Sequence, residues 1–327
     1  MDPSPGVPVG ESSAIDGTGP AQVPARSGVS GRRGGISAWA DRHFGVLLVL
    51  PAVALILLLS AYPLVFSLWV NFVNYDFQIP GHDFVGLQNF NETVADPVAR
   101  SALLITVGLS VAVVALELAL GLLLALAMLR PFQGRGVIMP ILIMPLFMSP
   151  AIVGQFWGLL LQRPFGPTDY LLGKLLGHPV TISWLTEAPW NFVAIVLADA
   201  WQWTPFMFVI LMAGLASISG EFYEAAELDG ASPWHTFAHI TLPLLAPIIL
   251  LAVTFRLLDA TKLFDIIYIM TGGGPGTSTY TASFYLYQIG FQEFHLSQAT
   301  AGSWIVLLLT IPVMTVLVRR LLRPEGA

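Results

Sequence analysis

The sequence contains no cysteine and has few charged residues. Its 327 residues include 14 Lys and Arg against 20 Asp and Glu, and only 10% of all residues are charged. Without cysteine, the chain forms no disulfide, no thiolate metal site and no thiol nucleophile. The formal net charge of −6 leaves no basic excess to neutralise phosphates, which argues against nucleic acid as a partner.

The sequence also lacks the short motifs of several enzyme classes. It has no G-x-x-x-x-G-K-[ST] phosphate-binding loop, no H-E-x-x-H and no G-x-S-x-G. We therefore expect no catalytic residue, no metal and no cofactor in this chain. Any ATP hydrolysis that accompanies its function has to occur in another chain.

Long apolar stretches dominate the composition. Hydrophobic residues make up 55% of the chain, and the mean hydropathy is +0.75. A soluble domain carries about 25% charged residues, so this chain has too few to cover a water-facing surface. We expect an all-α membrane protein with a single domain.

Six apolar windows are long enough to cross a bilayer as helices, which takes about 20 residues each. They lie at about residues 44–72, 101–129, 136–161, 190–217, 243–270 and 300–318. These windows predict a transmembrane domain over residues 41–323. Residues 1–40 are rich in Gly, Ser and Pro and show no periodicity, so we expect a disordered tail.

Basic residues predict the orientation of the chain. Nine of them fall on one side of the expected spans: Arg26, Arg32, Arg33, Arg42, Arg130, Arg135, Arg319, Arg320 and Arg323. Only Arg100, Arg163 and Lys174 fall on the other side. Because basic loops face the cytoplasm, both termini are expected there.

The segment between the fourth and fifth windows, residues 221–243, is too polar to span a membrane and falls on the cytoplasmic side. Residues 221–228 favour a short helix, and Gly230 can end it in the left-handed conformation. Ser232 followed by Pro233 marks the start of a second helix. The pattern predicts an acidic two-helix elbow, which is either a docking element for a partner's groove or a solvated loop.

Several polar side chains lie within or beside the apolar windows, where ionised groups are costly unless paired or hydrated. They are Glu117, Asp199, Gln202, Arg256, Asp259 and Lys262, with Trp201 and Trp203 next to Asp199. Arg256 and Asp259, three residues apart, can meet on one helical face, which Lys262 continues. We interpret the set either as a polar substrate route with stacking Trp rings, or as structural ion pairs with lipid-facing or packed Trp rings.

The elbow carries a recognisable motif. Glu224-Ala225-Ala226, followed by Gly230, Ile240 and Leu242-Pro243, resembles the EAA motif of permease subunits of binding-protein-dependent ABC importers. Three further stretches are similar to the carbohydrate-uptake branch of that family, and the likeness covers about residues 44–320. These stretches are residues 84–90, 204–206 and 255–275.

The resemblance implies the ABC type I importer permease fold, with six spans in a bacterial plasma (inner) membrane. It implies a permease subunit that moves a carbohydrate into the cytoplasm by alternating access. The implied partners are two ATP-binding subunits that hold ATP and Mg, a second homologous permease and an extracytoplasmic sugar-binding protein. The implied coupling residues are Glu224, Ala225, Ala226, Asp229 and Gly230. His235 and His239 depart from the family, which often has Arg or Lys in this half of the elbow.

Two alternatives remain open at the level of the residues. One is a secondary transporter that uses Glu117, Asp199 and Asp259 as proton or cation sites, although no repeated hydropathy pattern relates the two halves of the chain. The other is a membrane scaffold that docks through its elbow and transports nothing.

Overall fold

The computed structural model of the protein describes residues 35–76, 80–129, 131–164 and 166–321. The chain divides into two compact units, residues 1–60 and 61–327. The described residues are helical apart from turns, loops and a single antiparallel bridge between Val73 and Phe84. The predicted all-α fold class is confirmed.

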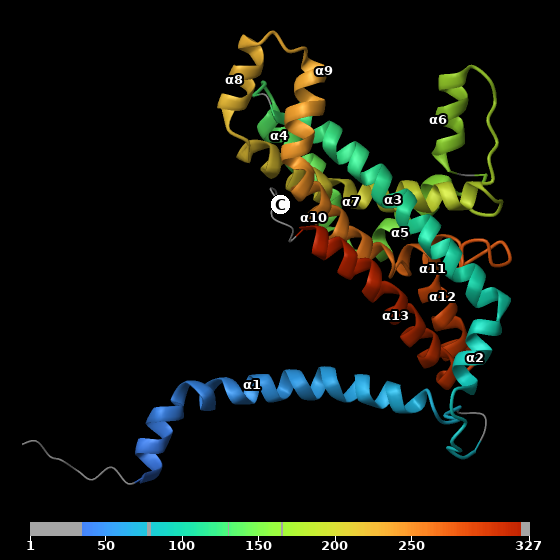
Figure 1. Cartoon of the computed structure of the whole chain (residues 1–327). Helices are drawn as coiled ribbons and strands as arrows, with labels where there is room; N and C mark the ends of the chain where they lie inside the picture. Colours follow the sequence, from blue (N-terminus) through green and yellow to red (C-terminus); the bar gives the residue numbers. More distant parts are fainter. Residues whose placement is uncertain (1–34, 77–79, 130, 165, 322–327) are drawn as a thin grey trace, which may run out of the picture. The chain divides into compact units, whose positions relative to one another are not determined.

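The described helices are shown in Figure 1. In chain order they are α1 (Gly35–Val70), α2 (Gln88–Ala95), α3 (Pro97–Leu129), α4 (Arg135–Ile143), the 3-10 helix η1 (Met144–Phe147), α5 (Pro150–Leu161), α6 (Pro167–Leu176), α7 (Trp190–Ser217), α8 (Gly220–Leu228), α9 (Pro233–Thr236), the π-helix η2 (Phe237–Thr241), α10 (Leu242–Ala260), α11 (Asp265–Met270), α12 (Ala282–Tyr287), the π-helix η3 (Gln288–Gln292) and α13 (Leu296–Leu321).

Five of the described helices are long and apolar enough to cross a membrane. They are His43–Val70 within α1, α3, α7, the continuous stretch Pro233–Ala260 that ends in α10, and α13. A sixth crossing requires Arg135–Phe147 and Pro150–Leu161 together, although these two segments are bent by 103°. The expected number of six spans is reached when the bent pair counts as one.

The third expected span, residues 136–161, is not a continuous helix. Pro140 lies inside α4, Pro145 lies in η1, and Pro150 begins α5. Pro145 and Pro150 stand at the start of η1 and α5, where proline is tolerated because the first residues of a helix need no backbone donor. The break therefore falls between α4 and α5 at these two prolines, whereas α4 continues past Pro140.

The first and fifth windows also differ from expectation at their ends. α1 begins at Gly35, so residues 35–40 are helical although they were expected within the tail, since no Gly or Pro interrupts residues 36–44. Residues 1–34 of the expected tail lie outside the described residues. In the fifth window α10 ends at Ala260 and α11 begins at Asp265, because Lys262 N donates to Asp259 O at 2.9 Å and closes a tight turn. Lys262 therefore does not continue the helical face of Asp259.

Two long helices form the centre of the second unit. α3 packs along α7, and α10 contacts both of them. Their buried interface includes Val113, Phe208 and Leu245. At Gly121 on α3 an added Cβ would lie 2.6 Å from Cβ of Met207 on α7, so only glycine permits this close approach.

Candidate functional site

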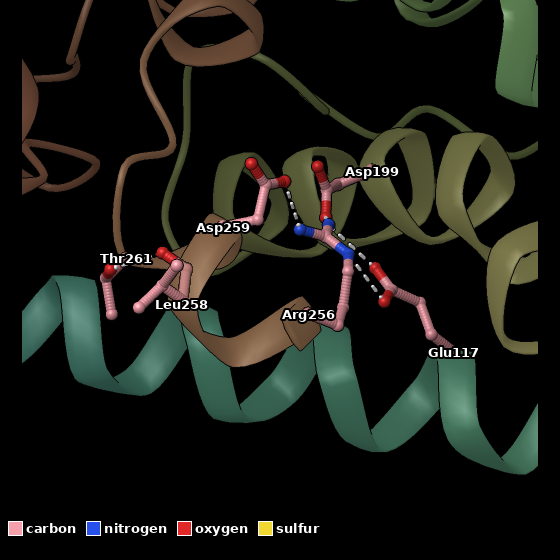
Figure 2. Close-up of polar contacts among 6 residues, drawn as sticks. All are labelled: Glu117, Asp199, Arg256, Leu258, Asp259 and Thr261. Atoms are coloured by element: carbon pink, nitrogen blue, oxygen red, sulfur yellow. Dashed lines mark hydrogen bonds and ion pairs between the residues drawn. The ribbon is translucent and has the colours of Figure 1, made fainter. Parts of the chain in front are cut away.

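A cluster of charged side chains joins α3, α7 and α10 inside the second unit (Figure 2). Arg256 on α10 donates from Nε and Nη2 to the two carboxylate oxygens of Glu117 on α3, at 2.8 and 2.9 Å. Nη2 also donates to Oδ2 of Asp199 on α7, and Nη1 donates to Oδ2 of Asp259 at 2.9 Å. One guanidinium therefore holds carboxylates from three helices.

Burial divides this cluster into an inner and an outer part. The side chains of Glu117, Asp199 and Arg256 are 0%, 1% and 1% exposed, whereas that of Asp259 is 53% exposed. A buried charge is tolerated when it is paired and hydrogen-bonded, which holds for the inner three. Asp259 is the member that reaches the surface of the chain.

Of the two Trp residues on α7 next to Asp199 in sequence, only Trp203 contacts the cluster. The central carbon of the Arg256 guanidinium, Cζ, lies over the ring of Trp203 at 4.7 Å from the ring centroid, in a cation-π arrangement. Trp201 instead stacks on Phe156 of α5, with ring centroids 5.8 Å apart. The two Trp residues that the sequence analysis grouped together therefore have different neighbours.

Buried polar atoms without a partner lie beside the cluster. Among the described residues, Asp199 Oδ1 and Gln202 Oε1 are buried and accept no hydrogen bond. The amide of Gln202 donates through Nε2 to the carbonyl oxygen of Met148 at 2.8 Å. Most buried polar groups are paired, so unpaired acceptors next to a charged cluster indicate a place where water or a ligand binds.

A pocket of about 580 Å³ opens where the broken third span meets α3 and α7. Trp201, Thr204, Phe156 and Met148 line it together with apolar residues of α3, α4 and η1. The hydroxyl of Thr204 has no hydrogen-bond partner. The sequence singled out Thr204 only within the stretch 204–206 and did not indicate Phe156 or Met148, because the prolines of the third span predict a bend but not the pocket wall that the bend forms.

The structure brings together most of the expected polar set. Glu117, Asp199, Arg256 and Asp259 form one network, and Gln202 lies on the same helix as Asp199. Lys262 is exposed in the turn after α10 and has no described ion pair with this network. No group of three or more His, Asp or Glu side chains in the described residues could hold a metal ion.

The first helix of the elbow and the turn after it form as the sequence predicts, but the second helix is not separate, because α9, η2 and α10 continue as one helix from Pro233 to Ala260. Ser219 caps α8, Gly230 follows that helix with φ +70°, and the Ser232 hydroxyl accepts a hydrogen bond from His235 N at 3.2 Å to begin α9. Figure 1 shows α8 and α9 together at one end of the second unit. The turn between α8 and α9 follows from these local signals at the helix ends.

The elbow exposes most of the motif residues. Glu224, Ala225, Asp229 and Gly230 are exposed, whereas Ala226 is buried within the chain. Ala226 therefore packs inside the elbow and is not available to a partner in this conformation. Large apolar side chains are also exposed on the elbow: Phe222, Leu228 and Trp234.

Comparison with known proteins gives the family. Residues 117–323 match the family model described as "Binding-protein-dependent transport system inner membrane component". A probable ABC transporter permease protein of Sinorhizobium fredii is 37% identical over 280 residues, which cover 85% of this chain and 90% of that protein. The trehalose/maltose transport system permease protein MalF of Thermococcus litoralis is 35% identical over 277 residues, which cover 85% of this chain and 92% of that protein.

The fold is also that of a solved transporter. A chain in the crystal structure of a bacterial alginate ABC transporter, in complex with an alginate pentasaccharide-bound periplasmic protein, superposes with a TM-score of 0.73 at 22% identity. The superposition covers 85% of this chain and 94% of that one. Neither an ion-coupled secondary transporter nor a non-transporting scaffold is supported by these relatives. The chain therefore belongs to the family of binding-protein-dependent transport system inner membrane components, and it is a multi-pass permease subunit of an ABC importer rather than an enzyme.

Proposed function

We propose that the imported substrate is a carbohydrate. The sequence stretches at 84–90 and 255–275 are similar to the carbohydrate-uptake branch, and the relative in Thermococcus litoralis is named for trehalose and maltose. A sugar needs many hydrogen bonds together with flat apolar faces for its rings. Charged, amide and aromatic side chains lie next to one another on α7 and α10, as that chemistry requires.

The substrate path runs along this part of the chain. Asp259 is the exposed contact, Trp203 is partly exposed, and Trp201 lines the pocket at the broken third span. Asp199 and Gln202 supply acceptors deeper inside. The remaining members of the path are Glu117 and Arg256, which position these groups, and Lys262, which is exposed in the turn after α10.

The observation that carries the coupling proposal is the connectivity of the elbow. α7 leads into α8 at one side of the elbow, and η2 leads into α10 at the other. α7 carries Asp199, and α10 carries Arg256 and Asp259. A partner that moves the elbow therefore moves the two helices on which the cluster is built.

We assign the elbow contact to ATP-binding subunits, two copies of which bind ATP and Mg and hydrolyse the nucleotide. Glu224, Ala225, Asp229 and Gly230 provide the exposed part of the contact, and Ala226 supports it from within. A second homologous permease completes the pore. An extracytoplasmic sugar-binding protein delivers the substrate on the other side of the membrane.

The transport cycle is alternating access within the transmembrane domain at residues 41–323, with both termini in the cytoplasm as the basic flanks predict. Closure of the ATP-binding subunits moves the elbow, and the spans change from an inward-facing to an outward-facing arrangement. The equilibrium between the two arrangements shifts because each bound partner has a different affinity for them.

Co-purification in mild detergent tests this function. We expect the tagged full chain to recover an ATP-binding subunit and a second permease, both identified by mass spectrometry. The double variant Glu224→Ala, Gly230→Pro should lose the ATP-binding subunit and keep the permease, since Pro at residue 230 cannot adopt the φ of +70° seen there.

The control is Glu187→Ala, which removes an exposed carboxylate from the loop before α7. This variant should recover both partners. Retention of the ATP-binding subunit by the double variant would remove the coupling role of the elbow. Recovery of the wild-type chain alone, with ion-driven uptake, would contradict the importer function.

A further inference from the structure

Nearly all the hydrogen-bonding capacity of Arg256 is used within the chain. A guanidinium has five N–H donors. Nε and Nη2 serve Glu117 and Asp199, and Nη1 serves Asp259 (Figure 2). One N–H of Nη1 remains, and the ring of Trp203 covers a face of the guanidinium. Arg256 cannot offer an entering anion the two parallel donors by which arginine binds carboxylates and phosphates.

Apart from the last N–H of Nη1 and the Thr204 hydroxyl, the polar atoms that remain open near the cluster are side-chain oxygens of Asp199, Gln202 and Asp259. Asp199 Oδ1 and Gln202 Oε1 are buried without a partner, while the donor end of Gln202 is bound to the Met148 carbonyl. Asp259 pairs with Arg256 through Oδ2, and its side chain is 53% exposed. A ligand that satisfies these atoms has to bring hydrogen-bond donors, because acceptors facing acceptors leave both unpaired.

The charges of the cluster also favour a ligand that carries hydrogen-bond donors over an anionic ligand. Three carboxyl groups of the chain itself surround the one guanidinium, so its positive charge is already matched within the cluster. Lys262, the basic residue that follows in sequence, is exposed and has no described ion pair with the cluster. A negatively charged ligand therefore finds no free cation in the cluster, and the member that it meets at the surface is the Asp259 carboxylate.

We propose, on the basis of the carbohydrate-transport function given above, that this site accepts sugars through their hydroxyl or ammonium donors and discriminates against anionic sugars. Neutral sugars bind by donating hydroxyl groups to Asp199, Gln202 and Asp259. A protonated amino sugar adds a charge-assisted hydrogen bond to Asp259. Uronates, sulfonated sugars and sugar phosphates bind more weakly at this site, whichever sugar the binding protein delivers.

The absence of native cysteine allows a direct test. Leu258 is exposed beside Asp259, so Leu258→Cys places one maleimide-reactive thiol next to the site. The assembled transporter is held in lipid nanodiscs without the binding protein, and labelling is measured on the band of this chain. The probes share one skeleton: trehalose, its 2-amino derivative and its 6-uronate.

We expect trehalose and the 2-amino derivative to protect the thiol at concentrations at least about tenfold below those needed for the uronate. When Asp259→Asn is added to Leu258→Cys, the concentration of the 2-amino derivative needed to protect the thiol should rise about tenfold relative to that of trehalose. The matched control is Asp265→Asn, which removes an exposed carboxylate from the start of α11, outside the cluster. It should leave the order of the three probes unchanged.

Two results would overturn the inference while leaving the proposed function in place. One is protection by the uronate at concentrations equal to or below those of trehalose. The other is no protection by any probe in a complex that imports a carbohydrate when its binding protein is present. A complex that assembles but imports no carbohydrate would overturn the proposed function, and the inference with it.

Discussion

Arg256 and Glu117 are 139 residues apart in sequence and share two hydrogen bonds, of 2.8 and 2.9 Å, between α10 and α3. Both side chains are almost completely buried. The pair fixes the register of two membrane-spanning helices around the cluster. Removal of one partner from a buried ion pair is far more damaging than removal of an exposed one, because the other charge stays behind.

Glu117→Ala leaves two N–H groups of Arg256 without an acceptor, while Asp199 and Asp259 still pair with its charge, so the variant should destabilise the chain by about 1–3 kcal/mol. The measurement is the thermal unfolding midpoint of the purified chain in detergent. The control is Glu92→Ala on α2, an exposed carboxylate that accepts a hydrogen bond from Gln88 at 2.7 Å, and it should cost less than about 1 kcal/mol. Equal midpoints for the two variants would contradict the structural role of the buried pair.

Gly121→Ala should separate α3 from α7. Its Cβ would lie 2.6 Å from Met207 Cβ and 2.9 Å from the backbone nitrogen of Phe208, and a backbone atom cannot give way cheaply. Overpacking of this kind costs about 1–3 kcal/mol. Gly108→Ala on the same helix is the matched control, since its Cβ would lie 3.9 Å from the ring of Phe192. Size-exclusion profiles after heating should show loss of folded protein for Gly121→Ala alone.

Gly230→Ala should loosen the elbow without any steric clash. Gly230 has φ +70° and no atom within 4 Å of an added Cβ, so the cost is conformational and is about 1 kcal/mol. The matched control is Gly220→Ala, because an added Cβ at Gly220 also meets no atom within 4 Å but Gly220 does not have a positive φ. Hydrogen exchange in residues 220–241 should rise in the first variant and stay constant in the second. Equal exchange would show that the left-handed turn does not limit elbow stability.

Tyr285 should make stability fall at alkaline pH. Its hydroxyl donates to Asp96 Oδ2 at 2.6 Å. The pKa of Tyr285 is raised above the ordinary 10.0, mainly because the side chain is buried and in addition because of the hydrogen bond to Asp96. A raised pKa in the folded state means that the contribution is complete below about pH 10 and is lost as the pH rises further. Tyr285→Phe should lower stability at neutral pH by about 1–3 kcal/mol and weaken the alkaline decline.

The control for the alkaline decline is Tyr170→Phe on α6, where the tyrosine is exposed. That variant should keep the full decline seen in the wild-type chain. Unfolding midpoints measured from pH 8 to pH 11 would distinguish the two variants. An unchanged decline in Tyr285→Phe would assign the alkaline sensitivity to other groups.

The sequence predicted the elements better than it predicted the contacts between them. The apolar window at 190–217 coincides with α7, and Gly230, Ser232 and Pro233 stand where the elbow turns, because these signals are local to the backbone. The contact between Arg256 and Asp259 is also present, since i, i+3 spacing fixes it. By contrast, the pairing of Glu117 with Arg256 depends on how α3 packs against α10, which periodicity does not encode.

The other differences between the predicted and the observed helices also depend on how the helices pack. Three prolines indicated an irregular third span, but the 103° bend depends on the helices that α5 contacts. The break after Ala260 has no Gly or Pro within residues 257–265 to mark it, so the fifth window read as continuous. Hydropathy alone does not distinguish one long helix from two apolar helices joined by a turn.

Asp199 provides the sharpest separation of transport from structure. Its Oδ2 binds Arg256, while Oδ1 is buried without a partner. Asp199→Asn keeps the size of the side chain but removes its charge, so we expect the assembled complex in normal yield and carbohydrate uptake reduced by at least about tenfold. The control is Asp83→Asn, an exposed carboxylate in the loop before α2, and it should leave both yield and uptake unchanged. Loss of the complex itself in Asp199→Asn would instead assign this carboxylate to helix packing, because a substrate contact is not needed for assembly.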